Sequence, residues 1–297
     1  MQPRATRFAI PEDDYHADKL PDPIGGVPSL SNSLAKVLLD KSPAHAYSAH
    51  PRLGGAGREW PASTLATFDR GKLAHKLLLG KGAEIVVVDA EDWKTKAARE
   101  ARDQARAAGK IPALIAPYEE AVKAAPIIRD KLAACGVVLD GESEVQVAWH
   151  ERIADPVLCR GMLDHLVVDA RKRTATVYDL KTTGDAKPES VSRSVVRYGY
   201  DTQRAAYSHA IEYLLGFEPA KIDFVFIFAE TAAPYAVLPG RLDATLHARG
   251  EERWSQAVDV WADCLRTGVW PEYARSIVEI EAPPWMSADI QIGFEEE

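Results

Sequence analysis

The fold of this chain is decided by two stretches, Gly161-Met162-Leu163-Asp164-His165 and Val177-Tyr178-Asp179-Leu180-Lys181-Thr182-Thr183. Both alternate between the two faces as β-strands do, and the polar segment 169–174 between them predicts a hairpin-type connection. Residues two apart on a strand share a face, so Asp179 and Lys181 point the same way. An antiparallel partner strand would bring Asp164 to that face, where two carboxylates and one ammonium group would converge.

Such a convergence suits a hard divalent cation such as Mg²⁺, which proteins hold with one or two carboxylates and a substrate phosphate. In the alternative interpretation, Asp164 is a turn or edge residue, and Asp179 and Lys181 form a solvated pair on an exposed strand. Short acidic and basic motifs recur by chance in long chains, so the neighbouring segments must decide between the two interpretations.

The composition excludes several classes of protein. With 297 residues, of which 46% are hydrophobic, the chain can bury one substantial core. Apolar runs are far shorter than the roughly 20 residues of a membrane span, and the N-terminus lacks the apolar core of a signal peptide. We therefore expect a cytoplasmic protein with no membrane association.

The few cysteines and the lack of a phosphate-loop motif argue against several cofactors. Cys135, Cys159 and Cys264 are few and far apart, so we expect neither a disulfide scaffold nor a four-cysteine zinc or iron–sulfur site. They are better interpreted as small buried or neutral residues. The chain also lacks a Gly-Lys-Ser/Thr phosphate loop, so ATP-driven action by this polypeptide is not expected.

The net charge of −8 does not indicate a nucleic-acid binder, but local clustering matters more than the sum. Between Lys94 and Lys110 there are six basic residues against two acidic ones. Four of them have a spacing that predicts one helical face and a candidate contact with a phosphate backbone: Arg99, Arg102, Arg106 and Lys110. A solvated helix face explains the same pattern.

The remaining pattern predicts one α/β (mixed α+β) domain in which helices flank a central mixed sheet. Residues 1–28 are expected to form a loosely held lead-in, and 286–297 an acidic tail. Between them, 29–290 would form a single domain, with a helical elaboration at 29–140 and a catalytic core at about 141–285. The core would comprise strands at 143–149, the two stretches above, a helix from Tyr200 to Leu215 and an apolar strand at 222–228, in the order αβββαβ.

Four further residues are candidates for the site. Gln203 and Tyr207 lie one helical turn apart and share a face, although Tyr207 could equally pack against the sheet. His75 lies on a predicted helix at about 69–79, where a lone histidine is more often structural; its imidazole could also complete a carboxylate metal site. Glu144 is a candidate fourth acidic group, and an exposed strand-edge carboxylate is its alternative.

In order and spacing, these motifs resemble the PD-(D/E)XK nuclease superfamily, which has a restriction-endonuclease-like core. Gln203-Arg204-Ala205-Ala206-Tyr207 resembles the Gln-x-x-x-Tyr element of its RecB-like branch, and Gly71 to His75 resembles a Gly-x-x-x-His element. The series from Leu30 to Trp285 resembles RecE-type (exonuclease VIII-like) phage and prophage exonucleases. Met162-Leu163 departs from that pattern, in which a basic residue often precedes the aspartate, so an extra phosphate contact is not expected there.

The resemblance implies a Mg²⁺- or Mn²⁺-dependent deoxyribonuclease, most readily a 5′→3′ exonuclease on double-stranded DNA ends. It implies that Asp164, Asp179, His75 and the Leu180 carbonyl hold the metal, that Lys181 acts on the attacking water, and that Gln203 and Tyr207 assist. It further implies phage or prophage encoding in a bacterial host, a single-strand annealing partner and a ring-shaped homo-oligomer. The alternatives are a RecB-like structure-specific or repair endonuclease and a non-catalytic DNA-binding recombination module.

Overall fold

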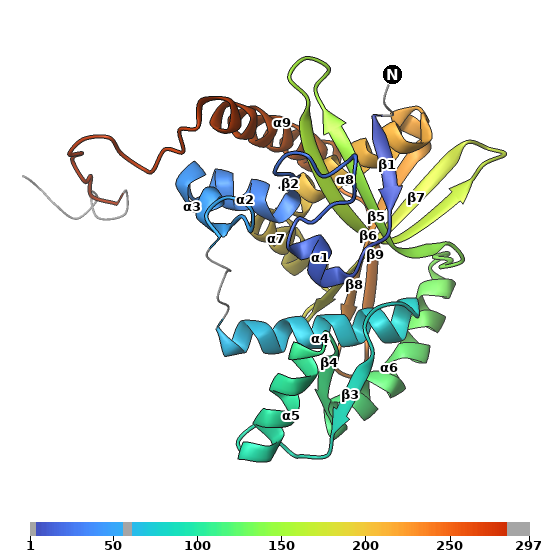
Figure 1. The fold of residues 1–297 in the computed structure, drawn as a ribbon. Helices are drawn as coiled ribbons and strands as arrows, with labels where there is room; N and C mark the ends of the chain where they lie inside the picture. Colours follow the sequence, from blue (N-terminus) through green and yellow to red (C-terminus); the bar gives the residue numbers. More distant parts are fainter. Residues whose placement is uncertain (1–3, 56–60, 284–297) are drawn as a thin grey trace, which may run out of the picture.

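The computed structural model describes residues 4–55 and 61–283. In these residues the large sheet comprises Ala5–Phe8 (β1), Leu30–Ser31 (β2), Glu142–Glu151 (β5), Val157–Asp169 (β6), Thr174–Thr183 (β7), Ile222–Glu230 (β8) and Val237–Gly240 (β9). Its order is β1-β5-β6-β7-β8-β9, with β2 paired to β6 (Figure 1). A second sheet contains Ile85–Val88 (β3) and Ile111–Leu114 (β4), which are parallel.

The centre of the large sheet is the predicted meander followed by a crossover. Strands β5, β6 and β7 are antiparallel neighbours, whereas β7 and β8 are parallel and therefore need a helical connection between them. That connection is Pro188–Tyr198 (α7) and Tyr200–Leu215 (α8), which ends at Gly216 in a left-handed conformation, as its glycine predicts. The expected mixed sheet flanked by helices is thus confirmed.

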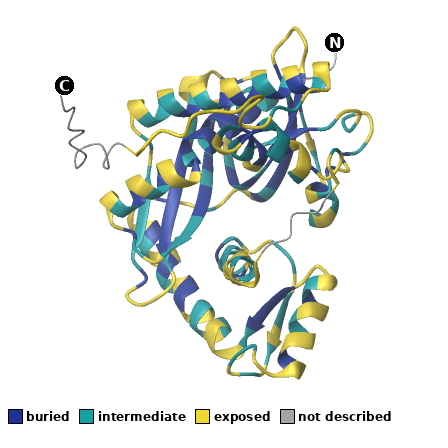
Figure 2. Ribbon diagram, turned by 90° about the vertical axis from the view of Figure 1, so that its left-hand side faces the viewer, coloured by how far each residue is buried: buried dark blue, intermediate teal, exposed yellow. Residues whose placement is uncertain are grey.

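Helices cover both faces of this sheet, as Figure 2 shows by the burial of its central strands. On one face, α8 packs with the long helix Ala244–Thr267 (α9), and the buried Trp254 and Trp261 of α9 belong to the same core as Phe226 on β8. On the other face, Leu180 and Ile227 pack against Ile115–Ala134 (α6). Strands β7 and β8 are therefore buried on both sides, which is why β8 is almost continuously apolar.

The small sheet lies beside two long helices, at the lower end of the molecule in Figure 1. Helix Lys96–Ala107 (α5) connects β3 to β4, and Ala62–Leu79 (α4) packs against both β4 and α6. Its core includes Leu73 of α4 and Ile111 of β4. Helix α4 also contacts β7, so it links the small sheet to the edge of the β5–β7 meander.

The N-terminal segment is part of the fold, which corrects the expectation of a loosely held lead-in for the residues described there. Strand β1 pairs antiparallel with β5 through Ala5–Phe8, and a short helix, Glu12–His16 (α1), follows it. Asn32–Asp40 (α2) begins after Ser31, whose hydroxyl caps it, and Pro43–Ala49 (α3) follows. Pairing over this sequence separation leaves no local pattern, so composition alone suggested a loop.

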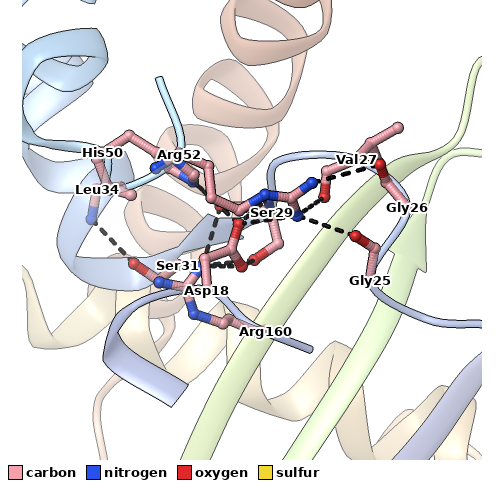
Figure 3. A network of polar contacts seen from close by, with 10 residues as sticks. All are labelled: Asp18, Gly25, Gly26, Val27, Ser29, Ser31, Leu34, His50, Arg52 and Arg160. Carbon is pink, nitrogen blue, oxygen red and sulfur yellow. Dashed lines mark hydrogen bonds and ion pairs between the residues drawn. The ribbon is translucent and has the colours of Figure 1, made fainter. Parts of the chain in front are cut away.

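A buried polar network ties this segment to the large sheet (Figure 3). Asp18 accepts hydrogen bonds from the Ser29 hydroxyl (2.5 Å) and main chain (3.1 Å), and from Arg160 (2.7 Å) on β6. His50 Nε2 and Arg52 Nη1 lie 3.3 Å and 3.5 Å from the same carboxylate. Three basic side chains and one serine thus surround a carboxylate that has no access to water.

Two further expectations concern the C-terminal residues and the crossing of a membrane. The predicted acidic tail, 286–297, and Trp285 lie outside the described residues. Among the helices of the described ranges, none combines the length and the apolar character that crossing a bilayer requires.

Candidate active site

Three acidic residues fall in one row across β5, β6 and β7. The β5–β6 ladder places Glu144 directly opposite Asp164, between the residue pairs that flank them on either side. The β6–β7 ladder ends at His165 and Tyr178, one residue before Asp164 would face Asp179. Carboxylates opposite one another on adjacent strands repel each other, so a row of three needs a compensating positive charge.

Local backbone irregularity accompanies this row. Glu144 has φ 55°, a left-handed conformation that is unusual for a residue with a side chain and that interrupts the regular strand. Asp164 Oδ2 accepts a hydrogen bond from the Leu180 main-chain N–H at 2.8 Å. The Asp164 carboxylate thus binds a main-chain N–H of β7 at the point where the β6–β7 ladder ends.

Asp179, Lys181 and Gln203 form a closed set of contacts, as the strand period and the helix position predict. Lys181 Nζ lies 2.5 Å from Asp179 Oδ1, and Gln203 Nε2 donates to Asp179 Oδ2 at 2.6 Å. Lys181 also donates to Gln203 Oε1 at 3.0 Å. The amide of Gln203 therefore donates to the carboxylate and accepts from the ammonium group, which fixes both on the face of β7 that α8 covers.

The electrostatics of this set are shaped by burial. Burial and the nearby charge of Asp164 together raise the pKa of Asp179 to about 6, against the lowering effect of Lys181. Burial also lowers the pKa of Lys181, but the carboxylates of Asp179 and Asp164 outweigh it, so the net pKa is raised. Lys181 is consequently an ammonium group at neutral pH, while Asp179 ionises less readily than a solvated aspartate.

The structure brings His75 to the same place from α4. Its Nε2 lies 3.1 Å from the Leu180 carbonyl oxygen and 3.6 Å from Asp164 Oδ2. The side chain is 29% exposed, so it is not a core histidine. The imidazole, the carbonyl and one carboxylate therefore meet, in agreement with the set of candidate residues chosen from the sequence.

Glu144 lies at the margin of this group. Its carboxylate is half-buried, and burial followed by the charge of Glu12 raises its pKa, whereas His75 lowers it. The carboxylate is therefore within electrostatic reach of the imidazole. Glu144 is consequently more than an exposed edge residue, although its own strand holds it in an irregular conformation.

Tyr207 occupies a structural position next to the site. It is buried in the main core, and its ring packs against Gly161, where a Cβ atom would lie 2.6 Å from the tyrosine Cε1. Burial raises the pKa of its hydroxyl, and the charges of Asp179 and Asp164 contribute to the same shift. Gly161 is thus required for β6 to approach α8 closely at this point.

Tyr200 is a contact of Lys181 that sequence reasoning did not assign. The Lys181 ammonium lies 4.5 Å from the centre of its ring, and the ring stacks on Phe226 of the neighbouring strand. Its position three residues before Gln203 on the same helix was the available signal. An aromatic face at this distance stabilises the ammonium group in a site from which water is largely excluded.

The basic cluster does not form the free cationic face that its spacing predicted. Helix α5 ends at Ala107, so Lys110 lies beyond it and pairs with Glu84 at 2.8 Å. Arg106 binds Asp69 of α4 at 2.6 Å, and Arg102 binds its neighbour Asp103 at 2.8 Å. These three charges are used in ion pairs around the small sheet, which corrects the expectation that they follow a phosphate backbone together with Arg99.

The donor atoms match the preference of a hard divalent cation, which is for oxygen ligands with an occasional imidazole. Across residues 4–55 and 61–283, His, Cys, Asp and Glu side chains do not gather in groups of three or more that could hold a metal ion. The two oxygens of Asp179 instead contact Lys181 and Gln203. The charge of Asp164 nevertheless raises the pKa of the buried Asp179, so the two carboxylates lie close together. Two neighbouring carboxylates are a donor set that fits a divalent cation.

Fold and site together define a domain of the PD-(D/E)XK nuclease class. Over residues 31–282 the chain matches the model of the PDDEXK-like domain of unknown function (DUF3799), and it belongs to that family. No curated protein matches the chain. A crystal structure from Eubacterium rectale, described as a "Putative exonuclease", has the same fold, with a TM-score of 0.58 at 11% identity over 96% of this chain and 100% of that chain.

Proposed function

We propose that the protein is a divalent-metal-dependent deoxyribonuclease and, more specifically, a 5′→3′ exonuclease acting on double-stranded DNA ends. The observation that carries the proposal is the contact set of Asp179, Lys181 and Gln203 beside Asp164. This is the arrangement that hydrolysis of a phosphodiester requires, because negative charge must be held and then neutralised at one point. Membership of the PDDEXK-like family supports hydrolysis of nucleic acid, and the resemblance to RecE-type exonucleases supports the polarity.

In this proposal Asp164, Asp179 and the Leu180 carbonyl would hold Mg²⁺ or Mn²⁺, with His75 beside them. The cation would supply a bound water of lowered pKa and screen charge on the scissile phosphate. Lys181, as an ammonium group, donates hydrogen bonds to the phosphate oxygens and orients the attacking water. Its raised pKa argues against a role as the base that deprotonates this water, which refines the two roles open from the sequence.

Further parts of the proposal concern partners. An exonuclease of this polarity leaves 3′ single-stranded tails, which a single-strand annealing protein would receive in phage-type recombination. A ring-shaped homo-oligomer would keep the enzyme on its substrate, because DNA threaded through a ring cannot dissociate sideways. Both follow from the resemblance, as does the phage or prophage origin, and the cytoplasmic location expected from the composition is part of the same proposal.

Digestion of labelled DNA tests the proposal. A linear duplex labelled at one 5′ end is incubated with Mg²⁺, with Mn²⁺ and with EDTA, beside a covalently closed circle and an Asp179→Ala variant. We expect metal-dependent release of labelled mononucleotides or short products from the linear duplex only. Cleavage of the circle would instead indicate an endonuclease, and binding without cleavage under either metal would indicate a non-catalytic module.

A further inference from the structure

The last residue of α7 presents an aromatic ring to solvent close to the candidate active site. Tyr198 is 47% exposed, whereas the tyrosines of the core, such as Tyr207, are 8% exposed. Single-stranded nucleic acid is recognised by stacking of its bases on accessible aromatic rings of this kind.

Two cations flank this ring. Lys36 Nζ lies 5.4 Å and Arg197 Cζ lies 5.6 Å from its centre. Lys36 comes from α2 and donates a hydrogen bond to the Arg197 carbonyl at 2.9 Å, so two elements distant in sequence meet at Tyr198. An aromatic face beside Lys and Arg side chains is the combination that holds a base and its phosphate together.

The ring is connected to the reacting centre through Tyr200. The ring centres of Tyr198 and Tyr200 are 5.7 Å apart, and Lys181 Nζ lies 4.5 Å from the centre of Tyr200. Gly199 lies between the two tyrosines and has a φ of 66°. This left-handed conformation changes the direction of the chain between α7 and α8. A strand end that reaches Lys181 would therefore pass Tyr198 within its first few nucleotides.

From these contacts we infer that Tyr198 stacks on an unpaired base of the DNA substrate, with Lys36 and Arg197 beside the adjoining phosphate. Inside a duplex both faces of a base are covered by its neighbours, so only a terminal or separated base can offer a face to this ring. The inference rests on the proposed nuclease function and adds to it that the strand end is unpaired as it reaches Lys181. Tyr198 is thus a substrate-positioning residue.

Binding without cleavage tests this directly. Duplexes with short single-stranded ends carry 2-aminopurine, whose fluorescence is quenched on stacking, at the first, second or third unpaired position, and EDTA prevents hydrolysis. We expect quenching at one position in the wild type and in Tyr198→Phe, and its loss in Tyr198→Ala. Fluorescence anisotropy should show that Tyr198→Ala binds about 5- to 150-fold more weakly, as expected for the loss of one stacked base.

Matched variants separate stacking from folding and from charge. Tyr273→Ala removes another exposed tyrosine, whose ring contacts His45, and should leave quenching and affinity unchanged. Lys36→Gln should lower the salt dependence of binding while keeping the quenching. Thermal melting verifies that each variant is folded, and Tyr198→Leu keeps apolar bulk without a ring for the case in which alanine unfolds the chain.

The outcomes distinguish this inference from the proposed function. Equal affinity and equal quenching in Tyr198→Ala and the wild type would overturn the stacking role, while metal-dependent cleavage by the same wild-type preparation would leave the nuclease proposal intact. A wild type that neither binds nor cleaves DNA would overturn both. In steady-state cleavage, the stacking role predicts a raised KM in Tyr198→Ala with kcat changed much less.

Discussion

Asp18 and Asp179 are both 1% exposed, but their pKa values are shifted in opposite directions. Burial would raise the pKa of Asp18, yet hydrogen bonds and ion pairs with His50, Arg160 and Ser29 outweigh it and hold the pKa below its usual value. For Asp179, burial and the charge of Asp164 outweigh the lowering effects of Lys181 and His75, so its pKa rises to about 6.

The difference separates a carboxylate that stabilises the fold from one that the proposed reaction would use. Around Asp18 the chain supplies enough donors to stabilise the charge by itself, and the result is a tie between the N-terminal segment and β6. Around Asp179 the chain brings a second carboxylate close and leaves a deficit of positive charge. Such a deficit is costly in the free protein, and it is the state that a bound cation would relieve.

The largest effect should follow from neutralising Asp179. We expect Asp179→Asn to lower kcat about a thousandfold or more, because the variant cannot supply the charge that the proposed cation needs. The same change should leave the free energy of unfolding unchanged or raise it, because it removes a buried charge that the fold stabilises poorly. Single-turnover cleavage and urea denaturation measure the two quantities, and a folded variant with near-wild-type cleavage would contradict the assignment.

Asp18→Asn should show the reverse behaviour. It leaves Arg160 buried without its charged partner, so we expect the free energy of unfolding to fall by about 3–5 kcal/mol. Cleavage by the folded fraction should be unchanged, because the network does not contact the reacting centre. Asp223→Asn is the matched control: it breaks an ion pair with Arg241 that is largely exposed, and should cost at most about 1 kcal/mol. Equal losses in the two variants would contradict the structural role of Asp18.

Gln203 offers a finer test, because it holds Asp179 and Lys181 in place without carrying charge. Gln203→Met keeps the volume but removes both hydrogen bonds, and we expect kcat to fall about 10- to 100-fold. Gln203→Glu should do no better, since a carboxylate can accept from Lys181 but cannot donate to Asp179. Steady-state kinetics of both variants beside Gln104→Met, on the exposed side of α5, would check this. Full activity of Gln203→Glu would show that only the acceptor matters.

The core of the site could be predicted from the sequence because its geometry is local. Asp179 and Lys181 share a face by the two-residue period of a strand, and Gln203 and Tyr207 share one by the helical period. The αβββαβ order follows from the same periodicities. Gly71 to His75 required the family resemblance, since the histidine alone gives no indication that α4 reaches the Leu180 carbonyl.

The remaining features depend on contacts between distant residues, which no local pattern encodes. Strand β1 pairs with β5 across more than a hundred residues, so the lead-in could not be seen as part of the sheet. The sequence predicted a basic face on α5 without acidic partners, because Asp69, which pairs with Arg106, is on another helix. The row of Glu144 and Asp164 depends on the register between β5 and β6, and the left-handed conformation of Glu144 is not one that a glutamate predicts.

A third buried carboxylate, Glu151 at the end of β5, extends the comparison to the far part of α8. It accepts hydrogen bonds from Trp149 (2.9 Å) and Trp254 (2.8 Å) and from His209 Nδ1 (3.0 Å), and the other ring nitrogen of His209 lies 2.9 Å from Glu251. Burial would raise the pKa of Glu151, but these contacts lower it. Like Asp18, it is a carboxylate that the chain saturates with donors.

At a single pH the smallest predicted effect is a gradual pH dependence of stability that His209 causes. Burial alone would lower the pKa of His209, but the bonds to Glu151 and Glu251 raise it to about 10. Because this value exceeds that of the unfolded chain, about 6.5, its stabilising contribution is complete below pH 6.5 and is lost as the pH rises toward 10. Urea denaturation should therefore show stability falling between pH 7 and 9.5, by no more than about 1.4 kcal/mol per pH unit.

His209→Gln, which keeps a hydrogen-bonding side chain but cannot take up the proton, should flatten that slope, whereas Asp179→Asn should not. An unchanged slope in His209→Gln would mean that the histidine is neutral between its two glutamates, and that the charge of Glu151 is stabilised by the other donors, Trp149, Trp254 and the Tyr213 hydroxyl.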